Sequence, residues 1–346
     1  MIRLSLMCLV VFLITFSCKP TTEHVHVDDE IIEVKEPEYA IVIHGGAGTI
    51  LRENMSVEKD SSYRAALNAA LDIGEKILAE GGSSLDAVEA TIHLMEDSPL
   101  FNAGRGAVFT HEGKNAHDAS IMVGDSQMAG ASTGTSNVRH PISLARAVME
   151  KSKHVMMSGV GAETFATEVG LEQVDPKYFY TERRWNSLQR ILKKEEAKLE
   201  LSEDDVDKKH GTVGCVALDK NGNIAAGTST GGMTNKRYDR IGDSPVIGAG
   251  TFADNASCGV SSTGHGEYFI RYTVARDIAA MMEYGGYTLE EAGEIIINQK
   301  LVEKGGTGGV VALDYKGNIT MPFNTAGMYR GWRKPGERYV GIYMGE

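Results

Sequence analysis

The residues Gly211-Thr212-Val213-Gly214 stand behind a charged stretch and begin an apolar run. A threonine hydroxyl within a chain is a weak nucleophile because no base takes its proton. If the bond before Thr212 were cut, the new α-amine, with an ordinary pKa of roughly 7.7–8.0, could act as that base. Gly211 would tolerate the backbone angles that attack on its carbonyl requires. On these four residues alone, the simpler interpretation is the start of a buried strand.

The rest of the chain carries several similar blocks, in which glycines stand beside polar side chains. They are His44–Gly48, Pro99–Thr110, His210–Asp219, Ala226–Lys236, Arg240–Gly250, Ser262–Glu267 and Pro322–Tyr329. Together and in this order, they resemble the plant-type asparaginase / isoaspartyl peptidase family of N-terminal-nucleophile hydrolases. The resemblance covers nearly everything from about Ala40 to the end.

This resemblance implies an α+β fold, a four-layer αββα sandwich built from one precursor that cuts itself into two interleaved chains. The cut would fall between Gly211 and Thr212, by an N-to-O acyl shift. Residues 40–211 would form the first part, with a mobile linker near 182–211, and residues 212–346 the second part of the same single domain.

The resemblance also implies roles for the residues around the proposed nucleophile. Thr230 would hydrogen-bond the hydroxyl and amine of Thr212, and Asn102 would steady them. Thr263 and Gly264 would form the oxyanion hole, which stabilises charge on the attacked carbonyl. Without the family, the favoured interpretation of Thr230 is a turn threonine beside two glycines, and Thr263-Gly264 is a turn from a strand to a helix.

By the same resemblance, Arg240, Asp243 and Gly266 would bind the substrate. A guanidinium binds a carboxylate through two hydrogen bonds, an aspartate can bind an ammonium group, and Gly266 would offer its carbonyl to that ammonium. The alternative for Arg240 and Asp243 is a local surface ion pair. Asp239 stands where many relatives have glycine, and aspartate tolerates left-handed backbone angles better than most residues.

The segment from residue 95 to 105 resembles a loop of the relatives. In those proteins, main-chain carbonyls of the loop coordinate a sodium ion. The implied ligands are Met95, Glu96, Ser98, Phe101, Ala103 and Arg105. Backbone ligation leaves almost no side-chain signature, so the sodium site depends on the resemblance alone. The chemistry itself requires no cofactor.

The implied activity is that of a threonine amidohydrolase that releases L-aspartate from isoaspartyl (β-aspartyl) dipeptides and from L-asparagine. Its partners would be these small molecules, and relatives suggest a dimer of αβ heterodimers. A glycosylasparaginase, acting on glycan-linked asparagine, is the alternative within the same fold. A more distant alternative is a non-catalytic lipoprotein that binds ligands.

Several elements must position these residues. Apolar spacing predicts helices over 61–80 and 142–151, and Ser83 to Asp86 resembles a capping box for another helix. Strands are expected at 40–44, 212–218, 224–228 and 258–263, helices at 267–283 and 289–304, and a final hairpin from 309. Cys215 and Cys258 lie in strand-like runs and are expected to be buried and unpaired.

The first residues differ from the rest. An apolar run over residues 4–16 fits an export signal spanning 1–17, and Cys18 resembles the lipidated residue of a bacterial lipoprotein, with simple secretion and a misread start as alternatives. Residues 18–39 then form an acidic tether, so the expected location is the periplasm or a bacterial membrane surface. The net charge of −12 argues against nucleic acid as a partner.

Overall fold

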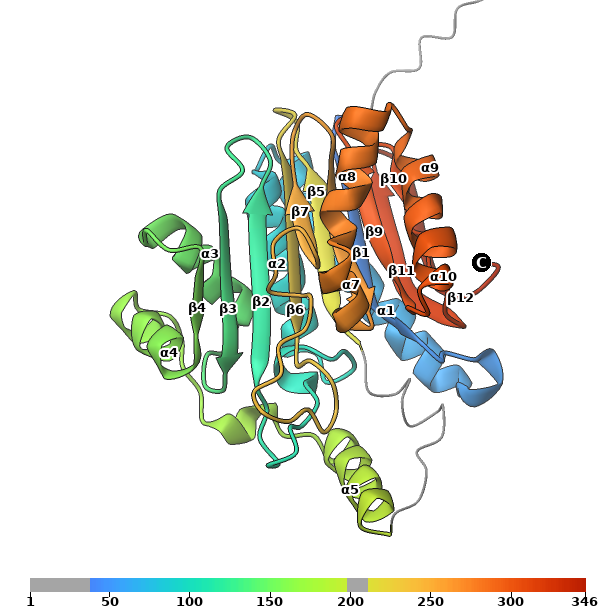
Figure 1. The fold of residues 1–346 in the computed structure, drawn as a ribbon. Helices are drawn as coiled ribbons and strands as arrows, with labels where there is room; N and C mark the ends of the chain where they lie inside the picture. Colours follow the sequence, from blue (N-terminus) through green and yellow to red (C-terminus); the bar gives the residue numbers. More distant parts are fainter. Residues whose placement is uncertain (1–37, 198–210) are drawn as a thin grey trace, which may run out of the picture. The chain divides into compact units, whose positions relative to one another are not determined.

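Two β-sheets organise the chain in the computed structural model, which describes residues 38–197 and 211–346 (Figure 1). The larger sheet has eight strands in the order β12-β11-β1-β5-β6-β2-β3-β4, and the smaller has four in the order β10-β9-β8-β7. Neighbouring strands are antiparallel except β3 and β4, which are parallel. The larger sheet comprises β1 Ala40–Gly48, β2 His117–Val123, β3 Ala129–Thr135, β4 Met156–Ser158, β5 Val213–Leu218, β6 Ile224–Thr230, β11 Gly327–Lys334 and β12 Glu337–Tyr343. The smaller comprises β7 Thr251–Ala253, β8 Cys258–Gly264, β9 Gly308–Asp314 and β10 Ile319–Thr320.

Different helices contact the two sheets. The helices α1, α2 and α3 contact the larger sheet, α8 and α9 contact the smaller, and strands of the two sheets contact each other. Figure 1 shows α2 behind β6 and α8 in front of the smaller sheet. The helices are α1 Val57–Ala79, α2 Ser84–Asp97, α3 Pro141–Lys151, α4 Gly159–Glu168, α5 Glu182–Glu196, α7 Gly266–Arg271, α8 Val274–Gly285, α9 Leu289–Glu294 and α10 Leu301–Glu303. Short turns are η1 Arg52–Asn54, η2 Gly104–Gly106, η3 Pro176–Phe179 and the π-helical η4 Ile295–Lys300, which joins α9 to α10.

Strand β5 contributes side chains to two hydrophobic cores, one on each face of the larger sheet. Successive side chains of a strand point to opposite faces, and both faces of β5 are covered. Val213, Cys215 and Ala217 pack in the core beneath α1 and α2, whereas Val216 and Leu218 pack in the core between the two sheets. Every residue of β5 is therefore buried.

The α+β class expected from the sequence is confirmed, and most predicted elements are present. Ser83 caps α2 by accepting a hydrogen bond from the Asp86 amide. The predicted helix over 267–283 is wrong in one respect, because α7 and α8 are separate helices. Between them Thr273 has a φ of 44°, in the left-handed region, where an α-helix cannot continue. The hairpin at 309 is not the last one, since β11 and β12 follow it.

Cys215 and Cys258 are both buried and free, as the sequence predicts. Among the helices of the described residues, none has the length and apolar character that crossing a bilayer demands. The proposed signal over 1–17, the tether up to residue 37 and the part of the linker from 198 to 210 lie outside the described residues.

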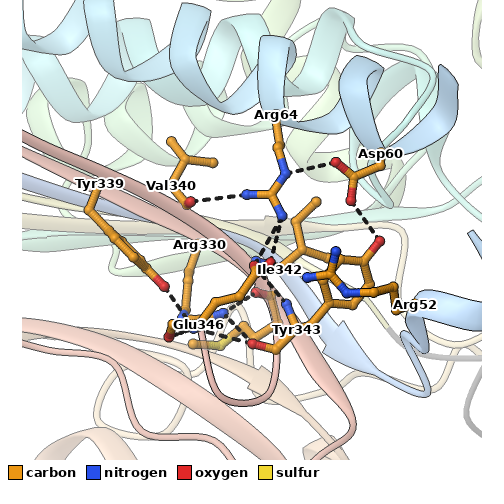
Figure 2. A network of polar contacts seen from close by, with 10 residues as sticks. Arg52, Asp60, Arg64, Arg330, Tyr339, Val340, Ile342, Tyr343 and Glu346 are labelled. Atoms are coloured by element: carbon orange, nitrogen blue, oxygen red, sulfur yellow. Dashed lines mark hydrogen bonds and ion pairs between the residues drawn. The ribbon is translucent and has the colours of Figure 1, made fainter. Parts of the chain in front are cut away.

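Glu346 fastens β12 to α1 through the polar network in Figure 2. Its carboxylate accepts hydrogen bonds from Arg64 at 2.9 and 3.0 Å and from the amide of Ile342 at 2.9 Å. Burial opposes ionisation, but these bonds outweigh it and lower the pKa of Glu346 to about 2.

Glu346→Gln is expected to lower the free energy of unfolding near neutral pH by about 1 kcal/mol, a value reduced for solvent screening. Because the folded-state pKa is depressed, the stabilisation is present above the pKa of the unfolded chain, roughly 4.3, and is lost as the pH falls towards 2. Urea denaturation at pH 7 and pH 3 measures this difference. Glu337→Gln, at the start of β12, is the control, and an equal loss there would contradict the assignment.

Candidate active site

Thr212 and Thr230 lie together because β5 and β6 are adjacent. Val213 pairs with Ser229 in the sheet, so the residue before β5 lies beside the last residue of β6. The Thr212 hydroxyl lies 3.2 Å from the Thr230 hydroxyl. Both threonines are buried, with exposed fractions of 6% and 2%.

The carbonyl of Gly211 accepts hydrogen bonds from three side chains. The donors are Thr212 Oγ1 at 2.7 Å, Thr230 Oγ1 at 3.0 Å and Asn102 Nδ2 at 2.8 Å. Asn102 is fixed in turn, because its Oδ1 accepts from the Val108 amide at 2.9 Å. Gly211 itself has a φ of 145°, which favours glycine. The peptide bond before Thr212 is thus strongly polarised next to a hydroxyl.

His44 supports Thr212 from β1, a role that the sequence did not indicate. Its Nδ1 donates to the Thr212 carbonyl at 3.2 Å, and its Nε2 lies 3.0 Å from the Ser261 hydroxyl. Burial lowers the pKa of His44 to about 3, so the ring is neutral at physiological pH. A neutral ring that donates through Nδ1 must accept at Nε2, and this fixes its orientation. The only sequence signal was its place before the glycines of the first block.

Thr263 and Gly264 end β8 and are joined to the Thr212 region through the glycine loop of β1. Thr263 is fully buried, and its Oγ1 accepts a hydrogen bond from the Ala47 amide at 3.3 Å. The neighbouring Gly46 lies so close to Thr212 that a Cβ on it would stand 3.3 Å from the Thr212 nitrogen. The absence of a side chain on Gly46 therefore lets the loop reach both threonines.

Arg240, Asp243 and Gly266 form one cluster, as the sequence predicts. A Cβ on Gly266 would stand 2.9 Å from both Arg240 Nη2 and Asp243 Oδ1, so only glycine leaves this space open. Asp243 has an exposed fraction of 4%, and its Oδ2 has no hydrogen-bond partner among the described residues. Burial raises the pKa of Asp243 to about 7. A buried acceptor without a donor is what a site for a cationic group requires.

Glu267 is a further member of this cluster that the sequence analysis did not assign. Its carboxylate accepts two hydrogen bonds from Arg240, at 2.8 Å from Nε and 2.7 Å from Nη2. Burial opposes ionisation, but Arg240 outweighs it and lowers the pKa of Glu267 to about 2. This bidentate pair fixes the plane of the guanidinium. Asp239 has a φ of 52°, in the left-handed region expected at this position.

The loop with the predicted sodium ligands runs from the end of α2 through η2. Carbonyl oxygens of Ser98, Pro99 and Phe101 are the atoms closest to the vacant side-chain position of Gly106. Glu96 is fully buried, and its Oε1 accepts from the Ser229 hydroxyl at 2.6 Å. Burial raises the Glu96 pKa well above its usual range. In the described ranges, no group of three or more His, Cys, Asp or Glu side chains could hold a metal. Main-chain carbonyl oxygens are ligands that hard cations accept.

The family model described as asparaginase matches residues 37–342. The chain belongs to this asparaginase family. It is 50% identical over 306 residues to an isoaspartyl peptidase of Escherichia coli strain K12, covering 88% of this chain and 95% of that protein. It is 42% identical to a probable isoaspartyl peptidase/L-asparaginase 2 of Arabidopsis thaliana, covering 85% and 95%, and 40% identical to an isoaspartyl peptidase/L-asparaginase of Xenopus laevis, covering 88% and 96%.

Within this asparaginase-family protein, the two clusters have complementary chemistry. One cluster presents a hydroxyl beside a polarised peptide bond at Gly211–Thr212. The other presents a fixed guanidinium next to a buried carboxyl, which suits a group that carries both a carboxylate and an ammonium. His44 and Glu96 hold the structure around the first cluster, through hydrogen bonds to the Thr212 carbonyl and to the Ser229 hydroxyl.

Proposed function

We propose that this protein is an isoaspartyl peptidase that also hydrolyses L-asparagine, releasing L-aspartate from both. The observation that carries the proposal is the hydroxyl of Thr212, held between Thr230 and the polarised Gly211 carbonyl. The relatives from E. coli and Xenopus laevis, with the names given above, support the choice of substrates. The αββα sandwich of an N-terminal-nucleophile hydrolase and a dimer of two-chain units complete the proposal.

Activation would cut the bond between Gly211 and Thr212. The Thr212 oxygen attacks the Gly211 carbonyl carbon and its proton passes to the Thr212 nitrogen as the carbon–nitrogen bond breaks, leaving Gly211 esterified to the Thr212 oxygen and the Thr212 amine free. Water then hydrolyses the ester. Asn102 and Thr230 already donate to the carbonyl oxygen and would stabilise its negative charge during attack.

Asn102→Ala is expected to slow this cut roughly 100- to 1,000-fold, because it removes one donor to the developing oxyanion. Mass spectrometry of freshly purified protein over time measures the fraction that remains whole. Asn115→Ala is a suitable control, since Asn115 is also buried near this loop but donates to Ala107 and Val108 instead. Cutting at the wild-type rate in Asn102→Ala would contradict the role.

Hydrolysis would reuse the same hydroxyl. The substrate α-carboxylate binds Arg240, its ammonium binds Asp243 and the Gly266 carbonyl, and Thr263 and Gly264 donate to the attacked carbonyl oxygen. The free amine of Thr212 takes the hydroxyl proton and passes it to the departing amine. The resulting aspartyl ester is hydrolysed by water, and L-aspartate leaves.

A sodium ion would be held by the carbonyls of the loop that carries Asn102, with Ser98 and Phe101 among the ligands and Met95, Glu96, Ala103 and Arg105 completing the proposed set. It would supply no chemistry and would only hold the loop in place. Lipidation at Cys18 and export are proposed from the sequence alone, because those residues lie outside the described ranges.

A substrate panel on the processed protein tests the proposal. L-Aspartate release is expected from β-aspartyl-leucine and L-asparagine, and little from glycosylated asparagine. Hydrolysis of the glycan conjugate alone would instead identify a glycosylasparaginase. A chain that stays whole after long incubation and hydrolyses none of the three would support a non-catalytic binding protein.

A further inference from the structure

A cavity of about 300 Å³ opens beside the Gly211–Thr212 bond, away from the Arg240 cluster. Gly211 and Asn102 line it, and Asn102 Nδ2 and Thr212 Oγ1 both bond the Gly211 carbonyl. The proposed nucleophile, Thr212 Oγ1, is thus hydrogen-bonded to a residue of the cavity wall, Gly211. None of Arg240, Asp243 and Gly266 lines it, so the cavity is separate from the proposed aspartyl site.

Four cations line this cavity, and no carboxylate of the described residues lines it. Arg183, Arg184 and Arg190 come from α5, which Figure 1 shows beyond the ends of the strands, and Lys59 comes from α1. No carboxylate in the described part of the chain forms an ion pair with any of the four, whereas Arg237 nearby pairs with Glu195 at 3.0 Å.

Two of these arginines are fixed in place by neutral groups. Arg183 donates to the carbonyls of Pro99 at 3.0 Å and Leu100 at 2.8 Å, and Arg184 Nε donates to the carbonyl of Gly106 at 2.8 Å. Burial, followed by repulsion from Arg183, lowers the pKa of Arg184 to about 9. Adjacent cations, of which Arg184 is half-buried, favour binding of an anion when no carboxylate of the described residues pairs with them.

The remaining walls suggest what the anion is attached to. Leu51, Met55 and Leu100 line the same cavity and offer apolar contact beside the positive charge. An amino acid with a free carboxylate and an aliphatic side chain matches this combination. In an isoaspartyl dipeptide, the residue that leaves on hydrolysis carries such a carboxylate, whereas the ammonia that leaves L-asparagine does not.

We infer that this cavity binds the leaving amino acid of isoaspartyl peptides, with the α5 arginines and Lys59 binding its α-carboxylate. The inference rests on the proposed function and deepens it. With the aspartyl end held by Arg240 and Asp243, the scissile bond lies at Thr212 and the leaving residue extends into the cavity. The cations then select peptides over L-asparagine.

The test compares three substrates with the processed protein and its Arg184→Gln variant: β-aspartyl-leucine, its C-terminal amide and L-asparagine. In the wild type, kcat/KM for the free acid is expected to exceed that for the amide about tenfold. In Arg184→Gln this preference disappears, mainly through a higher KM for the acid. The double variant Lys59→Gln/Arg190→Gln gives a second measurement if Arg184→Gln misfolds. Lys193→Gln removes a cation from the same helix outside the cavity and is the matched control.

The outcomes separate this inference from the proposed function. The inference is overturned if the wild type hydrolyses the acid and the amide with equal kcat/KM, or if both variants keep the preference for the acid. In either case, turnover of L-asparagine would still support the proposed function. Variants that change only the rate of cutting at Gly211–Thr212 also overturn it, because the cavity would then serve processing. No turnover of any substrate by the processed wild type would instead refute the proposed function.

Discussion

Thr212→Ala is expected to remain a single uncut chain and to lose hydrolysis of β-aspartyl-leucine and L-asparagine by at least about 10,000-fold. The substitution removes the only oxygen that lies 2.7 Å from the Gly211 carbonyl oxygen and 3.2 Å from Thr230 Oγ1 among the described residues. Losses of this size follow removal of a nucleophile in other covalent hydrolases. Intact mass and L-aspartate release measure the two effects.

Thr212→Ser is the matched control, because it keeps the hydroxyl and loses only a methyl group. It should still cut itself and hydrolyse both substrates, though more slowly, since serine has a freer χ1 angle than the β-branched threonine. Chemical capping of the new amine in processed wild type should abolish turnover. Activity that survives capping would mean that another group takes the proton.

Asp243→Asn is expected to lower kcat/KM for both substrates roughly 100- to 1,000-fold, because it removes the negative partner of the substrate ammonium in a buried site. The pH profile gives a second readout. Since the pKa of Asp243 is raised to about 7, kcat/KM of the wild type should fall as the carboxyl becomes protonated below that pH. Asp239→Asn is the control. Asp239 is an exposed carboxylate nearby, and asparagine also tolerates its left-handed backbone angles.

The same substitution should have the opposite effect on stability. A carboxyl whose folded-state pKa is raised contributes stability while it is protonated, and this contribution is lost as the pH rises through about 7. Asp243→Asn should therefore unfold at a higher temperature than the wild type at pH 8, with the gap narrowing at pH 5 and closing below roughly 3.9, the ordinary pKa of an unfolded aspartate. A lower melting temperature of Asp243→Asn than of the wild type at pH 8 would show that burial of the Asp243 carboxylate does not destabilise the folded protein.

The sequence indicated which residues lie together better than it indicated the strands around them. The glycine-bearing blocks identified the residues that the structure brings together at Thr212 and at Arg240. His44 and Glu267 escaped notice because their roles depend on partners far away in the chain, at Thr212 and Arg240. No local pattern marks such a contact.

The strands β2, β3, β11 and β12 were missed for a different physical reason. In β2 and β3 nearly every residue is buried, so the polar and apolar alternation of a half-exposed strand is absent. Strand β11 contains Arg330 and Arg333, which are buried because carbonyls, Asn68 and Asp72 satisfy their guanidinium groups. The break at Thr273 was hidden because the residues on both sides have good helical spacing.

The order of the larger sheet has a consequence for what a cut at residue 211 leaves behind. Strand β1 from the first part lies between β11 and β5 from the second, and β2 from the first part pairs with β6 from the second. The two pieces that such a cut would produce would therefore share one sheet, in which strands of one piece lie between strands of the other. Neither piece could dissociate without breaking the backbone hydrogen bonds between paired strands at the centre of the sheet. Cleavage of this one peptide bond would therefore leave a single folded unit.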